Sequence, residues 1–179
     1  FKKNSKIFTH CHSSTVIGAL KLVNVKFSVN NTETRPLYQG RKTANELAKM
    51  GIKVNHYVDS AAEDAIKNSN IILLGADYIN SEGNVYNKIG SYAISELAKK
   101  HKTPLFIITN SWKYSSKKLK IENRDSKEIW DVANKNITIK NPAFDIIPNK
   151  NIKGIVSELG VLKPKKFVNK VKKEYSWIK

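Results

Sequence analysis

The chain of 179 residues contains one cysteine, Cys11, and one methionine, Met50. A single cysteine cannot form an intramolecular disulfide, and disulfide-free chains are typical of reducing compartments, so we expect a cytoplasmic protein. Long apolar runs are also missing: none approaches the roughly 20 residues of a membrane-spanning helix, and no apolar segment of a secretory signal follows the basic opening residues. The composition thus argues against a disulfide-stapled scaffold and against any membrane partner.

Arginine is also scarce, since Arg35, Arg41 and Arg124 are the only examples. The formal net charge of +17 therefore comes almost entirely from lysine. A field of this sign attracts nucleic acid or anionic metabolites. The lysines are spread along the whole chain, however, and few aromatic residues alternate with them as base-stacking platforms would. We therefore interpret most of them as solvated surface residues and do not expect a nucleic-acid partner.

What the sequence does contain is an alternation of short apolar runs and helical patterns. With 40% apolar residues the chain can bury a core, and its length suits one domain without a second boundary. Alternation of this kind predicts successive strand–helix units that build a parallel sheet. The predicted strands are residues 7–9, 25–29, 52–58, 71–75 and 104–109, and the predicted helices are residues 16–22, 42–50, 61–66, 89–100 and 166–177.

The predicted fold class is therefore α/β, with a doubly wound, mainly parallel sheet flanked by helices. Three stretches fit this plan less well. Residues 115–127 are polar and rich in lysine and are predicted to form an exposed excursion. Residues 141–148 look like an irregular, proline-bounded segment, and residues 152–159 fit either a short strand or a short helix.

Sheets of this class bind ligands beyond the carboxyl ends of their strands, where the loops converge. Three such loops carry reactive or phosphate-binding residue types: Cys11 follows the first predicted strand, Asp77 the fourth and Lys113 the fifth. Cys11 lies just before a Ser/Thr cluster that can open a helix, where the helix dipole lowers a thiol pKa and attracts phosphate. The cluster consists of Ser13, Ser14 and Thr15.

Asn87 and Lys88 complete the candidate site. They lie about ten residues beyond Asp77 and are predicted to open a helix, where a lysine beside free amides makes an anion site. Together the loops supply a soft base, a carboxylate, two lysines and several hydroxyls, which suits chemistry on a phosphorylated small molecule. A simpler interpretation stays open for each: Cys11 as a small buried hydrophobe, Asp77 as a turn residue, and the lysines as solvated surface.

Five motifs give the sequence a specific family resemblance. Residues 9–13 are THCHS, 33–41 are ETRPLYQGR, 75–77 are GAD, 87–90 are NKIG and 141–145 are NPAFD. In this order they resemble the superfamily that joins the alpha, beta and delta subunits of translation initiation factor 2B with two sugar-phosphate isomerases. The resemblance implies that residues 1–179 form a single Rossmann-like C-terminal domain and that the N-terminal helical domain of the family is absent from this chain.

The resemblance leaves three members of the superfamily in competition. The regulatory subunits of initiation factor 2B typically lack the cysteine and replace the aspartate, whereas Cys11 and Asp77 are both present here. Methylthioribose-1-phosphate isomerases keep both residues but usually follow the fifth strand with a Pro-rich, Ser/Thr segment that ends in aspartate. Lys113 in this loop and His12 after the cysteine look more like archaeal ribose-1,5-bisphosphate isomerase. A sugar-phosphate isomerase is thus favoured over a non-catalytic homologue of the initiation-factor alpha subunit, with methylthioribose-1-phosphate isomerase third.

The family implies a role for each candidate residue. Cys11 would take the proton from C2 of ribose 1,5-bisphosphate and Asp77 would protonate the ring oxygen, giving ribulose 1,5-bisphosphate in the nucleotide salvage of AMP metabolism. These roles need two pKa values pushed apart: apolar walls raise that of Asp77, and the helix dipole or a lysine lowers that of Cys11. The residues that would hold the substrate and its phosphates are Ser13, Ser14, Thr15, Asn87, Lys88 and Lys113.

The resemblance also implies proton transfer without a cofactor or a metal, and a homo-oligomer that is either a dimer or a hexamer built from dimers. Pro36 and Gly40 fit tight turns or packing better than ligand binding. Asp145 is predicted to support the site or an interface rather than to react.

Overall fold

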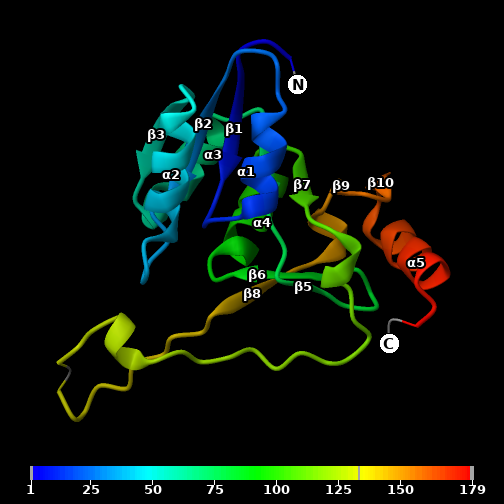
Figure 1. Cartoon of the computed structure of the whole chain (residues 1–179). Coiled ribbons are helices and arrows are strands. Elements are labelled where there is room, and N and C mark those ends of the chain that lie inside the picture. The colour runs from blue at the N-terminus through cyan, green and yellow to red at the C-terminus, as the bar shows by residue number, and fades with distance from the viewer. Residues whose placement is uncertain (1, 133, 178–179) are drawn as a thin grey trace.

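The computed structural model describes residues 2–132 and 134–177, and a seven-stranded sheet forms their centre (Figure 1). The strand order is β10-β9-β7-β4-β1-β2-β3, and every neighbouring pair is parallel except β9 and β10. The strands are β1 (Ser5–Thr9), β2 (Phe27–Thr32), β3 (Lys53–Tyr57), β4 (Ile71–Leu74), β7 (Leu105–Ile108), β9 (Gly154–Ser157) and β10 (Gly160–Leu162).

Helices cover both faces of this sheet and create two apolar cores. Neighbouring residues of a strand point to opposite faces, so Ile7 packs in one core and Phe8 in the other. The first core lies under α1 (Ser14–Lys21) and α2 (Gln39–Lys49), and the second under α3 (Ala62–Lys67), α4 (Ser91–Lys100) and α5 (Pro164–Glu174). The predicted α/β class, with a doubly wound and mainly parallel sheet, is therefore confirmed.

A second, antiparallel sheet was not predicted. It contains β5 (Tyr78–Ile79), β6 (Val85–Lys88) and β8 (Phe144–Ile147), in the order β5-β6-β8. The sequence interpretation expected an irregular segment at 141–148, and this is wrong for Phe144–Ile147, which form β8. Residues 152–159, for which strand and helix were left open, contain β9.

The prediction that Asn87 and Lys88 open a helix is also wrong. Both residues end strand β6, and α4 begins only at Ser91. Gly90 separates the two elements with a φ of +99°, a left-handed conformation that glycine adopts at little cost. The Asp145 carboxylate accepts hydrogen bonds from the backbone N–H groups of Gly90 (2.7 Å) and Tyr92 (3.2 Å), so β8 fixes the start of α4. Asp145 therefore has a structural role at the start of α4.

The lysine-rich excursion is present as expected. Residues 115–132 and 134–141 leave the body of the molecule and return to it as a long arm (Figure 1). None of the helices that the structure describes combines the length and the apolar character needed to cross a lipid bilayer.

Candidate active site

The strand order creates a switch point between β1 and β4. From β1 the chain builds outward to β2 and β3, then returns to β4 and builds outward to β7 and β9 in the opposite direction. In doubly wound sheets the crevice at such a reversal is where ligands bind. Cys11 follows β1, Asp77 follows β4 and Lys113 follows β7, so the three candidate residues lie in the loops after three adjacent strands.

Cys11 is buried among polar groups. Its side chain is 9% exposed, yet within the part of the chain that the structure describes it belongs to neither apolar core. Its backbone has a φ of 66°; its N–H donates to Thr34 Oγ1 (2.9 Å), and its carbonyl accepts from Thr43 Oγ1 (2.8 Å). A left-handed backbone at a residue other than glycine is uncommon and needs such support. These surroundings differ from those of a cysteine that serves as a small core hydrophobe.

Burial raises the pKa of the Cys11 thiol above its ordinary value. The backbone N–H of His12 and the charge of Lys88 oppose this shift, while Asp77 and Asp59 add to it. The expected lowering by the helix start is therefore wrong in its net direction. Ser13, not Cys11, is the N-cap of α1 and accepts the hydrogen bond from Val16 N (3.4 Å), and the loss of water around the thiol outweighs the nearby lysine.

The role implied for Asp77 requires a raised pKa, and the structure agrees with that prediction. Its side chain is open to solvent on one side, but the surrounding protein displaces enough water to raise the pKa of the carboxyl. Lys113 and then Lys88 oppose that rise. The backbone N–H of Asp77 donates to the carbonyl of Tyr86 (2.9 Å), which fastens this loop to β6.

Lys88 is a positive charge that acts to lower the pKa of both Cys11 and Asp77. Its stem is buried, and its ammonium lies 5.7 Å from the ring centroid of Phe144. Within residues 2–132 and 134–177, no group accepts a hydrogen bond from this ammonium or forms an ion pair with it. Asn87 donates from Nδ2 to Ser91 Oγ (2.8 Å). A buried lysine without a counter-charge is a group that an anionic ligand stabilises.

The hydroxyl cluster connects the start of α1 to the end of β7. Ser13 Oγ donates to Thr15 Oγ1 (2.9 Å), because the Thr15 hydroxyl gives its own hydrogen to the carbonyl of Ile108 (2.9 Å). Gly75 permits this arrangement, since a Cβ at that position would lie 2.6 Å from Ser13 Oγ and 3.9 Å from Asn87 Oδ1. Ser14 is exposed at the first position of α1, and no hydrogen bond of the described residues joins its side chain to the other candidates.

Two residues of the site were missed in the sequence. His10 is buried, and since the carbonyl of Ile89 can only accept, His10 Nε2 carries the hydrogen that bonds to it (2.9 Å). Burial lowers the pKa of His10, so the ring is neutral and its Nδ1 accepts from the Thr32 hydroxyl. The Asp59 carboxylate accepts hydrogen bonds from the backbone N–H groups of Thr34 (2.8 Å) and Arg35 (2.6 Å). The available signal was position: His10 precedes Cys11, and Asp59 follows the third strand at the same edge.

Three comparisons with known proteins show the family and the fold of the chain. The model of the initiation factor 2 subunit family matches residues 1–164. The chain belongs to that family. The chain is 37% identical over 186 residues to ribose 1,5-bisphosphate isomerase of Pyrococcus furiosus. The alignment covers 96% of this chain and 57% of that relative. It is also 37% identical over 183 residues to methylthioribose-1-phosphate isomerase of Natranaerobius thermophilus, with 89% and 53% covered.

Among solved structures, this member of the initiation factor 2 subunit family superposes on the crystal structure of translation initiation factor eIF-2B from Pyrococcus horikoshii OT3. The TM-score is 0.85 at 28% identity, with 94% of this chain and 62% of that chain covered. The chain thus spans a little over half the length of the relatives that it matches. Fold similarity extends equally to catalytic and translational members, so the side chains at the switch point must distinguish them.

Proposed function

We propose that the protein is a cytoplasmic sugar-phosphate isomerase that converts ribose 1,5-bisphosphate into ribulose 1,5-bisphosphate for nucleotide salvage. The observation that carries this proposal is the arrangement of Cys11 and Asp77 at the switch point, with the unpaired Lys88 acting on both. Several similar archaeal proteins bear the name ribose 1,5-bisphosphate isomerase, which supports the same conclusion. We further expect the complete protein to be a homo-oligomer.

The first half of the reaction opens the sugar ring. Cys11, as the thiolate, takes the hydrogen of C2 as a proton, and the electrons of that C–H bond form a double bond between C1 and C2. The bond between C1 and the ring oxygen breaks, and protonated Asp77 gives its proton to that oxygen. Asp77 suits this role because a carboxyl with a raised pKa keeps its proton closer to neutral pH.

The second half converts the resulting enol into the ketone. The Asp77 carboxylate takes the proton from the hydroxyl on C2, and the Cys11 thiol returns a proton to C1. Both residues finish in the state in which they began, and the sugar has lost and gained equal numbers of protons. The raised pKa of Cys11 means that little thiolate exists without substrate. Only this thiolate fraction can take the C2 proton, and Lys88 is the nearby charge that increases it.

The lysines of the site indicate which sugar phosphate is bound. A bisphosphate carries two dianionic groups, and this site offers Lys88 at the end of β6 and Lys113 after β7, with the hydroxyls of Ser13 and Thr15 between β1 and β7. Methylthioribose 1-phosphate carries a thioether where the second phosphate would be, and Lys113 would then have no counter-charge from the substrate. The similarity to methylthioribose-1-phosphate isomerases keeps that sugar as the second candidate.

The experiment is an isomerase assay on the complete protein with both sugars. We expect turnover of ribose 1,5-bisphosphate to exceed that of methylthioribose 1-phosphate. Lys113→Met should raise KM for the bisphosphate while it changes turnover of the monophosphate little. Faster turnover of methylthioribose 1-phosphate would favour a methylthioribose-1-phosphate isomerase. No turnover of either sugar would favour a non-catalytic relative of the initiation factor.

A further inference from the structure

The last helix of the chain presents a basic surface that the proposed isomerase reaction does not use. α5 buries Phe167, Val168 and Val171 in the second core, and Glu174 is its only acidic residue. No carboxylate in the described ranges forms an ion pair with the lysines of its outer face. These exposed lysines are Lys165, Lys166, Lys170, Lys172 and Lys173.

A cationic cleft lies at the beginning of α5. It has a volume of about 780 Å³ and is formed by the end of α4, the segment before β7, residues 149–153 and the first residues of α5. This cleft lies at the amino ends of β7 and β9, whereas the candidate active site lies at the carboxyl ends of the strands. None of the candidate site residues lines the cleft. Its lining contains no acidic residue but six lysines: Lys99, Lys102, Lys150, Lys153, Lys163 and Lys165. Charges of one sign around a cleft attract a polyanion.

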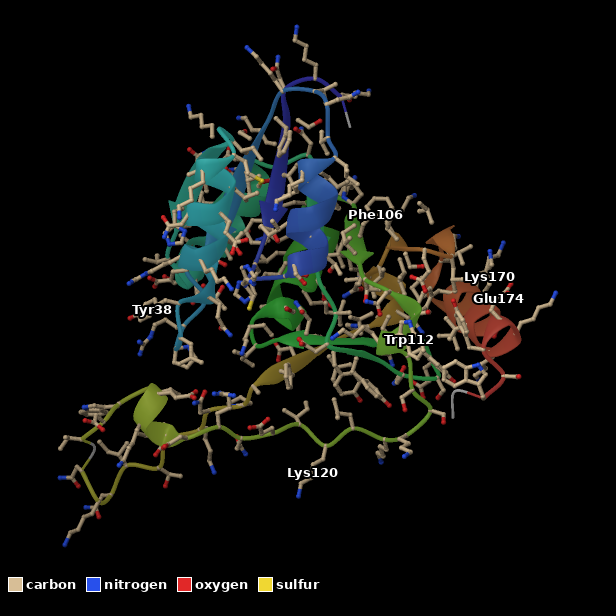
Figure 2. All side chains as sticks on the ribbon, viewed as in Figure 1. Tyr38, Phe106, Trp112, Lys120, Lys170 and Glu174 are labelled. Carbon is tan, nitrogen blue, oxygen red and sulfur yellow. The ribbon has the colours of Figure 1, made fainter. Side chains whose placement is uncertain are left out.

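An aromatic cluster lies at the other end of α5. The ring centroids of Trp112 and Trp177 are 5.3 Å apart, and Tyr175 lies 6.2 Å from the first and 6.1 Å from the second. Both indoles stay mostly in water, with exposures of 66% for Trp112 and 63% for Trp177. Figure 2 shows Trp112 beside the end of α5 that carries Glu174. Trp112 is distant from the other two residues along the chain, so the sequence analysis, which expected no nucleic-acid partner, did not identify this cluster.

We propose that this surface binds single-stranded nucleic acid, with the phosphates along the lysines of α5 and unpaired bases on the exposed indoles. α5 has 11 residues and so spans about 16 Å, and it connects the lysine cleft to the aromatic cluster as one track. Proteins that bind single strands combine a basic path for the backbone with aromatic faces on which bases stack. The charge of the track and the exposed indoles at its end favour this ligand over a protein segment. A duplex hides its base faces, so it can use only the lysines.

The test is fluorescence anisotropy of a labelled 16-nucleotide deoxythymidine oligomer, titrated with the complete protein. Trp112→Ala and Trp177→Ala should each weaken binding about fivefold or more, the equivalent of one lost stacked base. Trp112→Phe, which keeps an aromatic face, should lose less than Trp112→Ala and separates stacking from a folding defect. A duplex of the same length should bind more weakly than the single strand in wild type, and the Trp variants should narrow that difference.

The control for overall charge is a matched pair of charge reversals. Lys170→Glu with Lys173→Glu should weaken binding at least tenfold at low salt. Lys49→Glu with Lys53→Glu makes the same change in net charge at the opposite edge of the sheet and should have less than a twofold effect. Equal losses in the two pairs would reduce the binding to general attraction by a basic protein and overturn the proposal. If the Trp variants change the sedimentation of the protein but not its affinity for the oligonucleotide, the cluster belongs instead to an interface between two copies of the chain, and the proposal is overturned.

Discussion

His10 Nε2 donates a hydrogen bond of 2.9 Å to the carbonyl of Ile89, which joins the end of β1 to the loop after β6. Through this bond the residue before Cys11 is fixed to the residue after Lys88. Gly90 leaves room for the ring, since a Cβ there would lie 3.2 Å from His10 Nε2. The two halves of the candidate site, one from each sheet, are thus held in one arrangement by a neutral imidazole.

Removal of the imidazole should therefore loosen both halves. His10→Ala leaves the Ile89 carbonyl and the Thr32 hydroxyl without their partner, and buried groups left unpaired cost about 1–3 kcal/mol each. We expect the free energy of unfolding to fall by at least about 2 kcal/mol in urea titrations, with a lower kcat. His12→Ala is the matched control: among the described residues the His12 side chain has one polar contact, a partly exposed one to Glu46 (3.1 Å), so the loss should stay below about 1 kcal/mol. Equal losses would contradict the bridging role of His10.

Gly75 provides a test of close packing between β4 and α1. In Gly75→Ala the new methyl would lie 2.6 Å from Ser13 Oγ and 2.8 Å from Ser13 Cβ, so α1 must shift. Overpacking of this kind costs about 1–3 kcal/mol, and thermal unfolding should report it. Ser13→Gly removes both clashing atoms at the cost of a few tenths of a kcal/mol for the cap, so the double variant should recover most of the loss. Gly18→Ala meets nothing within 4 Å and should raise stability by about 0.5–1 kcal/mol.

Asp77→Asn should stabilise the protein at neutral pH while it removes activity. The pKa of Asp77 is raised in the folded state, so its ionisation opposes folding above that pKa. This penalty fades as the pH falls from the raised value to the ordinary carboxyl value near 4. The Tm of Asp77→Asn should thus exceed that of wild type at pH 7, and the two should converge below about pH 4. Asp131→Asn makes the same change in net charge on the exposed arm and should not reproduce the pattern.

The charges around Cys11 predict opposite shifts in two variants. Burial raises the pKa of the thiol, Lys88 lowers it and Asp77 raises it. The pH at which the alkylation rate by iodoacetamide is half-maximal should therefore rise in Lys88→Met and fall in Asp77→Asn. Cys11 is the only cysteine of the 179 residues, and the mass of the peptide that contains it reports this thiol alone. Unchanged midpoints in both variants would mean that the three groups do not share one site.

Much of the fold could be predicted because local patterns of apolar and polar residues determine it. Five strands of the central sheet, β1, β2, β3, β4 and β7, and the helices between them follow apolar periodicity, and the topology that results brings Cys11, Asp77 and Lys113 to the carboxyl ends of neighbouring strands. The region of β9 was left open between strand and helix, and β10 was not predicted. The second sheet could not be found in this way. β5 has two residues, and β6 pairs with β8 across more than 50 residues of intervening chain, so neither leaves a local signal.

Lys88 and Cys11 show why the chemistry of the site was harder to predict than its location. Lys88 looked like a helix residue because the helical pattern begins nearby, but Gly90 and the carboxylate of Asp145 delay α4 until Ser91. The pKa of Cys11 depends on how much water the whole fold displaces from the sulfur, and no local motif contains that quantity. The direction for Asp77 was correct because the same displacement acts on it in the sense expected.

The central claim is that Cys11 removes the proton of C2 while Asp77 supplies one to the ring oxygen. The most direct measurement is turnover by the complete protein of ribose 1,5-bisphosphate that carries deuterium at C2, beside the unlabelled sugar. We predict that the deuterated sugar reacts more slowly in wild type, and that Cys11→Ser and Asp77→Asn each abolish turnover of both. Equal rates for the two sugars in wild type, with activity retained in Cys11→Ser, would contradict the assignment of Cys11 as the base.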